Sequence, residues 1–293
     1  MSNDFETKQK VREFYDKVGW QLGNEGLYQN ARYEDLRPVS RDYIHRCHLR
    51  VGKHLNHSGR YLLDAGSGPV QYQEYLGYSQ GYDYRVCADI SILALQEARR
   101  RIGSHGLFVV ADITHLPFKP GVFDGEVSLH TLHHLPLEDQ PMAYAELYRV
   151  LAQSSTAVVV NGWSHAPLMM RTAWLVRLVE RVGRLLARLL GKNKNPKVEP
   201  QPPAAKNEIQ LQKPEGTFVK KMTAATLKAQ LQGQMDFEIL VWRSVNVRFL
   251  RVLIHPASGG WFWLKILFWL EERFPHFMGE KGQYPLIVIR KGL

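Results

Sequence analysis

The sequence predicts an α/β protein with a doubly wound parallel sheet, and three observations lead to this prediction. Short apolar runs alternate with helical patterns between residues 61 and 161, as in parallel sheets that are covered by helices on both faces. A glycine turn, Gly66 to Gly68, directly follows the first run, and an aspartate ends each of the next two. Ligands of such sheets bind outside the carboxyl ends of the strands, so we expect a ligand site there.

The composition is that of an ordinary globular protein, with 45% hydrophobic and 23% charged residues in a chain of 293. The first ten residues, MSNDFETKQK, have no apolar stretch that would indicate a secretory signal or membrane anchor. Two cysteines exclude a disulfide framework and a cysteine-rich metal site. We therefore expect a cytoplasmic protein.

The apolar periodicity and the capping residues predict the elements in order. Helices are expected at 7–20 and at 40–56, the second with Ser40 as its N-cap. The core follows with strands at 61–65, 84–89, 107–111, 123–129 and 156–161, and with helices after Pro69, at 91–102 behind Ser91, and at 138–151. A long helix at 166–191, a polar proline-rich loop at 192–216, a helix at 224–232 and strands at 237–243 and 284–290 complete the chain.

Four segments of the sequence resemble the motifs of a known family. The turn lacks the third glycine of a dinucleotide fingerprint, because Gln71 stands there, which disfavours a nicotinamide enzyme. The segments LLDAGSGP, CADIS, ADITHLPF and FDGEVSLHTLHHL instead resemble the first four motifs of the class I S-adenosylmethionine-dependent methyltransferases. The resemblance covers residues 61–161 well. It implies a Rossmann-like, doubly wound seven-stranded sheet with helical lid insertions, and S-adenosylmethionine as cofactor.

The resemblance also divides the chain into regions. Residues 1–60 would form an N-terminal helical cap, and residues 61–161 the cofactor-binding α/β core. Residues 162–222 would be an insertion with a basic amphipathic helix and a loop. Residues 223–293 would complete the core, with an aromatic-rich insertion at 246–283. Both insertions are expected on the side where the acceptor enters, as a lid or docking surface.

The same resemblance implies a role for individual residues. Asp89 would accept hydrogen bonds from both ribose hydroxyls, a task that suits an ionised carboxylate, which only accepts. Asp112 would bind the adenine amino group, and Asp64 would orient the glycine turn or reach the cofactor ammonium through water. The remaining implied cofactor-binding residues are Gly66 and Gly68 at the methionine portion, Ile90 and Ile113 around the adenine ring, and Leu129. The alternative is that Asp64 and Asp89 only cap helices.

The N-terminal segment contributes a further candidate. Tyr15, together with Trp20, lies in a segment that in similar proteins folds over the cofactor, where an aromatic ring can attract a cation. Packing of a helix against the sheet is the alternative for both residues.

Histidines follow the fourth strand, and His130 is the candidate catalytic base because imidazole titrates near neutral pH. A hydrogen-bonded loop residue that only shapes the pocket is the alternative for His130. His133 and His134 come next in order. No carboxylate completes an H-E-x-x-H pattern with them, so no metal is expected.

The basic excess lies in the second half of the chain. Residues 1–150 carry 17 Lys and Arg against 19 Asp and Glu, whereas residues 151–293 carry 21 against 9. Within the segment 166–192, residues 174–192 have one basic helical face and an opposite aliphatic face, a pattern typical of helices in a membrane interface. The segment 259–274 adds three tryptophans and three phenylalanines. Peripheral contact with the inner membrane surface and internal packing both fit these segments, whereas nucleic acid is not expected.

These observations predict a methyltransferase that acts on a small or lipid-like acceptor. Methylation of oxygen is favoured over methylation of carbon. Two alternatives stay open, a nucleotide-dependent oxidoreductase and a non-catalytic module that binds the cofactor without turnover.

Overall fold

The structure, a computed structural model, describes residues 2–16, 34–189 and 218–292. Within these residues seven strands form one sheet in the order β3-β2-β1-β4-β5-β7-β6. The strands are β1 (Gly59–Ala65), β2 (Tyr82–Asp89), β3 (Gly106–Val110), β4 (Phe123–Leu129), β5 (Leu151–Val160), β6 (Asp236–Arg243) and β7 (Tyr284–Arg290). Strand β7 runs antiparallel to β5 and β6, and the other neighbouring pairs are parallel. The predicted seven-stranded class I architecture is therefore confirmed.

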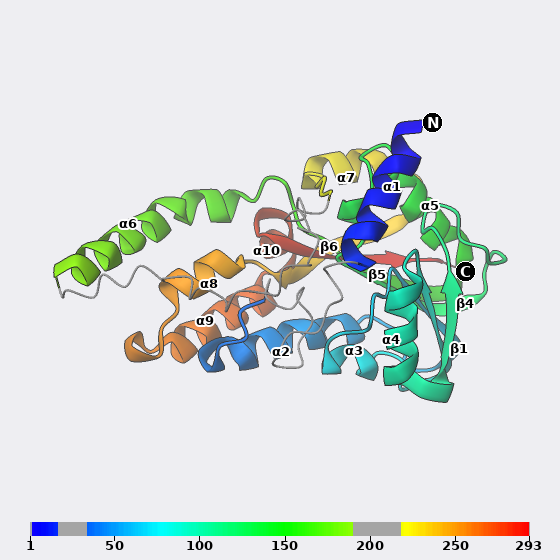
Figure 1. Ribbon diagram of the computed structural model, residues 1–293, viewed down its shortest axis with the longest axis horizontal. Helices are drawn as coiled ribbons and strands as arrows, with labels where there is room; N and C mark the ends of the chain where they lie inside the picture. The colour runs from blue at the N-terminus through cyan, green and yellow to red at the C-terminus, as the bar shows by residue number, and fades with distance from the viewer. Residues whose placement is uncertain (1, 17–33, 190–217, 293) are drawn as a thin grey trace, which may run out of the picture.

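Helices cover both faces of this sheet (Figure 1). They are α1 (Ser2–Phe14), α2 (Pro38–Gly52), α3 (Gln73–Gly77), α4 (Ile92–Ile102), α5 (Gln140–Val150), α6 (Pro167–Leu189), α7 (Ala224–Leu231), α8 (Val247–Leu253), α9 (Gly260–Arg273) and α10 (Pro275–Lys281). The predicted helix at 166–191 and the predicted strand at 284–290 are confirmed almost residue for residue. The predicted loop at 192–216 lies outside the described residues.

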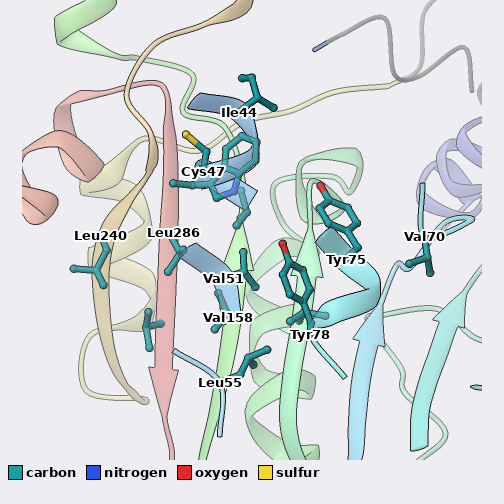
Figure 2. Packing of buried hydrophobic residues seen from close by; sticks show 14 of the residues in the cluster. Ile44, Cys47, Val51, Leu55, Val70, Tyr75, Tyr78, Val158, Leu240 and Leu286 are labelled. Carbon is teal, nitrogen blue, oxygen red and sulfur yellow. The ribbon is translucent and has the colours of Figure 1, made fainter. Parts of the chain in front are cut away.

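Side chains of the strands alternate between two hydrophobic clusters, one on each face. On β1, Leu62 belongs to the cluster that includes residues of α2, α3 and α9, whereas Leu63 belongs to the cluster that includes α5 and α7. Figure 2 shows Ile44, Cys47 and Val51 of α2 in the first cluster. Because β5 and β7 are covered on both faces, they contain continuous apolar runs, at 157–160 and 286–289.

One of the two predicted N-cap residues is confirmed and the other is wrong. Ser91 caps α4 as predicted, since its side chain accepts a hydrogen bond from the Ala94 amide at 3.1 Å. The prediction of Ser40 as an N-cap was wrong, because α2 begins at Pro38, whose fixed φ suits the first helical turn. Ser40 is instead buried and donates to Asp35 at 2.7 Å. The helix predicted at 7–20 ends at Phe14, and the segment around Trp20 lies outside the described residues.

The buried carboxylate of Glu271 on α9 forms hydrogen bonds with α2 and with the residue after β6. This carboxylate accepts hydrogen bonds from the Tyr43 hydroxyl at 2.7 Å, from the Arg50 guanidinium at 2.9 Å and from the Ser244 amide at 2.8 Å. A buried ion pair is strongly destabilising when one partner is removed, because the other charge loses its compensation. Glu271 therefore fixes the position of the aromatic-rich segment.

We predict that Glu271→Ala lowers the free energy of unfolding by about 3–5 kcal/mol, measured by urea denaturation. The matched control is Glu272→Ala, since Glu272 also pairs with Arg50, at 2.8 Å, but has a side chain that is 41% exposed. The control should lose at most about 1 kcal/mol, as is usual for exposed ion pairs. Equal losses in the two variants would contradict this role of Glu271.

Candidate active site

A cavity of about 470 Å³ opens at the carboxyl ends of the central strands. The order of the strands reverses between β1 and β4, and in open α/β sheets this switch point is where ligands bind. The walls come from the glycine turn after β1, the end of β2, the segment after β4, helix α1, and single residues from the second half of the chain. The volume lies within the usual range for small-molecule sites.

The turn after β1 has a backbone that only certain residues adopt. Gly66 and Gly68 have φ angles of 72° and 53°, in the left-handed region that favours glycine. A Cβ atom on Gly66 would lie 2.2–2.7 Å from side-chain atoms of Thr131, so no larger residue fits there. Val70 also has a positive φ, 53°, which is unusual for a β-branched residue and indicates strain beside the cavity.

Asp89 lies at the end of β2, and its carboxylate is held by two main-chain amides. One oxygen accepts from the Gly68 amide at 2.9 Å and the other from the Ser91 amide at 2.8 Å. Asp89 also lines the cavity, and each of its oxygens has a second lone pair for another donor. Burial raises the pKa of Asp89 to about 6, so the carboxylate is ionised above that pH. This geometry fits a ligand that presents two neighbouring hydroxyl groups.

The structure brings seven of the ten predicted site residues to the cavity and leaves three outside it. The lining residues among them are Tyr15, Gly66, Gly68, Asp89, Ile90, Leu129 and His130. Asp64 is buried and forms an ion pair with Arg85, whose Nη2 lies 2.5 Å from the carboxylate. Asp112 accepts a hydrogen bond from Lys8 at 2.8 Å, and Ile113 is buried in the cluster with α5 and α7.

Helix α1 covers the cavity and is held there by one lysine. The Lys8 ammonium lies 2.8 Å from the carboxylate of Asp112 and 3.1 Å from that of Asp139. Burial opposes the charge of Lys8, but hydrogen bonds to the two carboxylates outweigh it and raise the pKa of the ammonium. An adenine amino group at Asp112 would therefore share this carboxylate with Lys8.

A second contact joins α1 to the segment after β4. The Tyr15 hydroxyl lies 2.7 Å from Nε2 of His134, and Nδ1 of His134 lies 2.8 Å from the carbonyl oxygen of Phe218. Because a carbonyl only accepts, we assign the proton of the ring to Nδ1, so that Tyr15 donates to Nε2. Burial lowers the pKa of His134 to about 4, consistent with a neutral ring.

His130 differs from its neighbours in having both ring nitrogens available. His130 has a φ angle of 58°, and its imidazole makes edge contacts with Trp242 at 4.9 Å and Tyr284 at 5.9 Å between centroids. No hydrogen bond joins its ring to any described residue, whereas Nδ1 of His133 lies 3.2 Å from Asn161. Burial lowers the pKa of His130 to about 3, so its imidazole is neutral at physiological pH.

Two charged residues that line the cavity, Glu34 and Lys221, were not predicted from the sequence. Glu34 is paired with Arg243, whose guanidinium lies 4.7 Å from the ring centroid of Tyr284. Lys221 also lines the cavity, from a segment that follows the predicted loop. These residues belong to no motif and reach the site only through contacts distant in the sequence, so no local pattern could have indicated them.

Comparison with known families identifies the central part of the chain. The sequence model of a family described as "Methyltransferase domain" matches residues 63–159. This range includes the glycine turn, Asp89 and the histidine segment. No curated protein matches the chain in sequence.

Solved structures share the fold over nearly the whole chain. The 4+2 cyclase SpnF has a TM-score of 0.52 and 15% identity, and the alignment covers 98% of this chain and 97% of SpnF. The DhpI protein, in a complex with SAM and HEP, has a TM-score of 0.55 and 12% identity over 99% of both chains. Phosphoethanolamine N-methyltransferase 1 of Haemonchus contortus has a TM-score of 0.58 and 9% identity, and 99% of this chain aligns with 50% of that one.

We predict that Lys8→Met loosens α1, because it removes both ion pairs that hold the helix over the cavity. The expected result is amide hydrogen exchange in residues 2–14 that is about tenfold faster than in the wild type, measured by mass spectrometry. Lys10→Met, which changes an exposed lysine of the same helix, is the matched control and should leave the exchange unchanged. Equal exchange in wild type and Lys8→Met would contradict the proposed restraint.

Proposed function

Because the chain carries a domain of the class I S-adenosylmethionine-dependent methyltransferase family, we propose that it methylates a small or lipid-like acceptor, with oxygen favoured over carbon. The single observation that carries this proposal is the position of Asp89, held by the Gly68 and Ser91 amides at the edge of the cavity. A carboxylate in that position suits the two hydroxyl groups of a ribose. The DhpI structure is of a complex with SAM and HEP. The structure of the Haemonchus contortus protein is of a complex with phosphoethanolamine and S-adenosylhomocysteine. Both complexes support a small acceptor.

The residues that line the cavity are chemically suited to the cofactor. We assign the ribose to Asp89 and the methionine portion to the backbone of Gly66 and Gly68, where the absence of side chains leaves room. Ile90 and Leu129 line the same cavity and supply apolar surface to it. When bound, S-adenosylmethionine supplies a methyl group already activated by the positive sulfur, so the protein mainly has to align the acceptor.

We assign to His130 the role of the base that takes up the proton lost by a hydroxyl acceptor. Its imidazole lines the cavity and has no hydrogen-bond partner among the described residues, so a ring nitrogen has a free lone pair for that proton. Burial makes the ring a weak base, so a negative charge beside it in the bound state must raise its pKa for this role. The two rings beside it, Trp242 and Tyr284, limit its rotation. We assign to His134 a different role, since both of its nitrogens are engaged with Tyr15 and Phe218. It positions α1 above the site.

Transfer of an isotopically labelled methyl group tests the function directly. The purified protein is incubated with labelled S-adenosylmethionine and a cell extract, and the products are separated into lipid and aqueous fractions. Labelled product is expected with the wild type and not with Asp89→Asn, which has lost the carboxylate. Cofactor binding without any labelled product would favour the non-catalytic module instead.

We predict that His130→Asn lowers turnover by about 10²-fold or more, the usual contribution of a general base. Asparagine is chosen because it tolerates the left-handed backbone at this position better than alanine. Affinity for S-adenosylhomocysteine, measured by calorimetry, should stay within about twofold of the wild type, since His130 is not assigned to the cofactor. His57→Asn, at an exposed histidine, is the control. Unchanged turnover in His130→Asn would remove the residue from the mechanism.

We further propose that α6 and α9 dock on an anionic lipid surface. The aliphatic face of α6 is open to solvent in the described structure, and Figure 1 shows this helix extending away from the sheet beside α8. Trp174 on α6 is 61% exposed and Trp269 on α9 is 62% exposed. Arginines occupy the opposite side of α6, which adds electrostatic attraction to apolar insertion. Among the described helices, none combines the length and the apolar character needed to cross a bilayer.

We predict that the charge reversal Arg181→Glu/Arg184→Glu lowers binding to phosphatidylserine-containing vesicles by at least about tenfold, measured by sedimentation. The estimate follows from a contribution of about 1 kcal/mol for each basic residue near an anionic surface. Arg99→Glu/Arg100→Glu on α4 carries the same change of charge elsewhere and is the control. Equal binding of the two variants, or equal binding to neutral vesicles, would contradict docking through α6.

A further inference from the structure

The cavity extends well beyond the position assigned to the cofactor. Along the edge of the sheet, Asp89 ends β2, His130 follows β4, and Gly162 follows β5. Lys221 packs at Gly162, where a Cβ atom would lie 3.0 Å from the lysine Nζ. Neighbouring strands are about 4.8 Å apart, so β5 lies about 14 Å across the sheet from β2. Lys221 therefore belongs to the part of the cavity beyond the ribose position, beside His130 and Tyr284.

The backbone around Lys221 is fixed by hydrogen bonds on both sides. The Lys220 amide donates to the carbonyl oxygen of His133 at 2.8 Å, and the Ser164 amide donates to that of Met222 at 3.0 Å. The side-chain amide of Gln140 donates to the carbonyl oxygen of Lys220 at 2.8 Å. These hydrogen bonds hold the main chain of Lys221 in place, which favours recognition of a ligand at a defined position.

The Lys221 ammonium has no hydrogen-bond or ion-pair partner among the described residues. The carboxylate of Glu34, which lines the same cavity, is already paired with Arg243. His130 and His134, which line the same part of the cavity, are neutral and offer no compensating charge. Burial lowers the pKa of Lys221, as expected for a cation that is partly removed from water without a counterion. The partner of this charge is therefore expected among the ligands.

We propose that the acceptor carries an anionic oxygen group, a carboxylate or a phosphoryl group, and that Lys221 binds it. This inference rests on the proposed methyltransferase function and specifies the acceptor of that same site. An anion held at β5 leaves the rest of the acceptor directed toward His130 and the cofactor position. Neutral molecules of the same shape would leave the ammonium uncompensated and bind more weakly.

The test uses the full chain saturated with S-adenosylhomocysteine and small probes followed by ligand-observed NMR. The probes are benzoate, its neutral isostere benzamide, and inorganic phosphate. Benzoate or phosphate should bind the wild type at least about tenfold more tightly than benzamide. Preference for benzoate would indicate a carboxylate acceptor, and preference for phosphate a phosphoryl acceptor.

Three variants identify the group responsible. Lys221→Gln should lose at least about tenfold in anion affinity, Lys221→Arg should retain affinity within about threefold, and the control Lys220→Gln, at an exposed neighbour, should match the wild type. All three should bind S-adenosylhomocysteine as the wild type does, which also shows that they are folded.

The outcomes that overturn the inference are distinct from failure of the proposed function. No anion binding, equal binding of benzoate and benzamide, or undiminished anion binding by Lys221→Gln would each overturn it. Weaker binding of S-adenosylhomocysteine by Lys221→Gln would assign the ammonium to the cofactor and would also overturn it. If the wild type did not bind S-adenosylhomocysteine at all, the proposed function would fail, and this inference would fail with it.

Discussion

Two main-chain hydrogen bonds to the carboxylate of Asp89 join the parts of the site. One comes from Gly68 in the turn after β1 and the other from Ser91 at the start of α4, so a single side chain connects the ends of two neighbouring strands. The turn can approach the carboxylate because Gly66 and Gly68 adopt positive φ angles. Burial raises the pKa of Asp89 to about 6, so the carboxylate is ionised at neutral pH although it has lost much of its solvation.

The rest of the cavity is arranged around this fixed point. Helix α1 covers it through Lys8 and Tyr15, which contact residues after β3 and after β4. On the other side, His130 and Lys221 present a neutral imidazole and an uncompensated ammonium to the same space. Under the proposed function, the side assigned to the cofactor presents a carboxylate that accepts hydrogen bonds, and the side assigned to the acceptor presents an imidazole and a cation. This division fits a reaction in which two ligands of different polarity meet.

The parts of the structure that were predictable are those determined by local patterns. Apolar runs of the right length indicated the strands, and Ser91 indicated the start of α4, because capping acts within one helical turn. The same rule gave a wrong helix start at Ser40, because α2 already begins at Pro38. The ion pair of Lys8 with Asp112 and the position of Lys221 were beyond prediction, because they join segments far apart in the sequence, and neither lysine belongs to a motif. Motifs therefore indicated Asp89 and His130, whereas only the fold revealed Lys221.

A crystal structure of the protein with S-adenosylhomocysteine tests the central claim most directly. Both oxygens of Asp89 should lie about 2.7 Å from the two ribose hydroxyls while they keep their hydrogen bonds to Gly68 and Ser91. A ligand bound elsewhere, or a ribose that does not touch Asp89, would contradict the account.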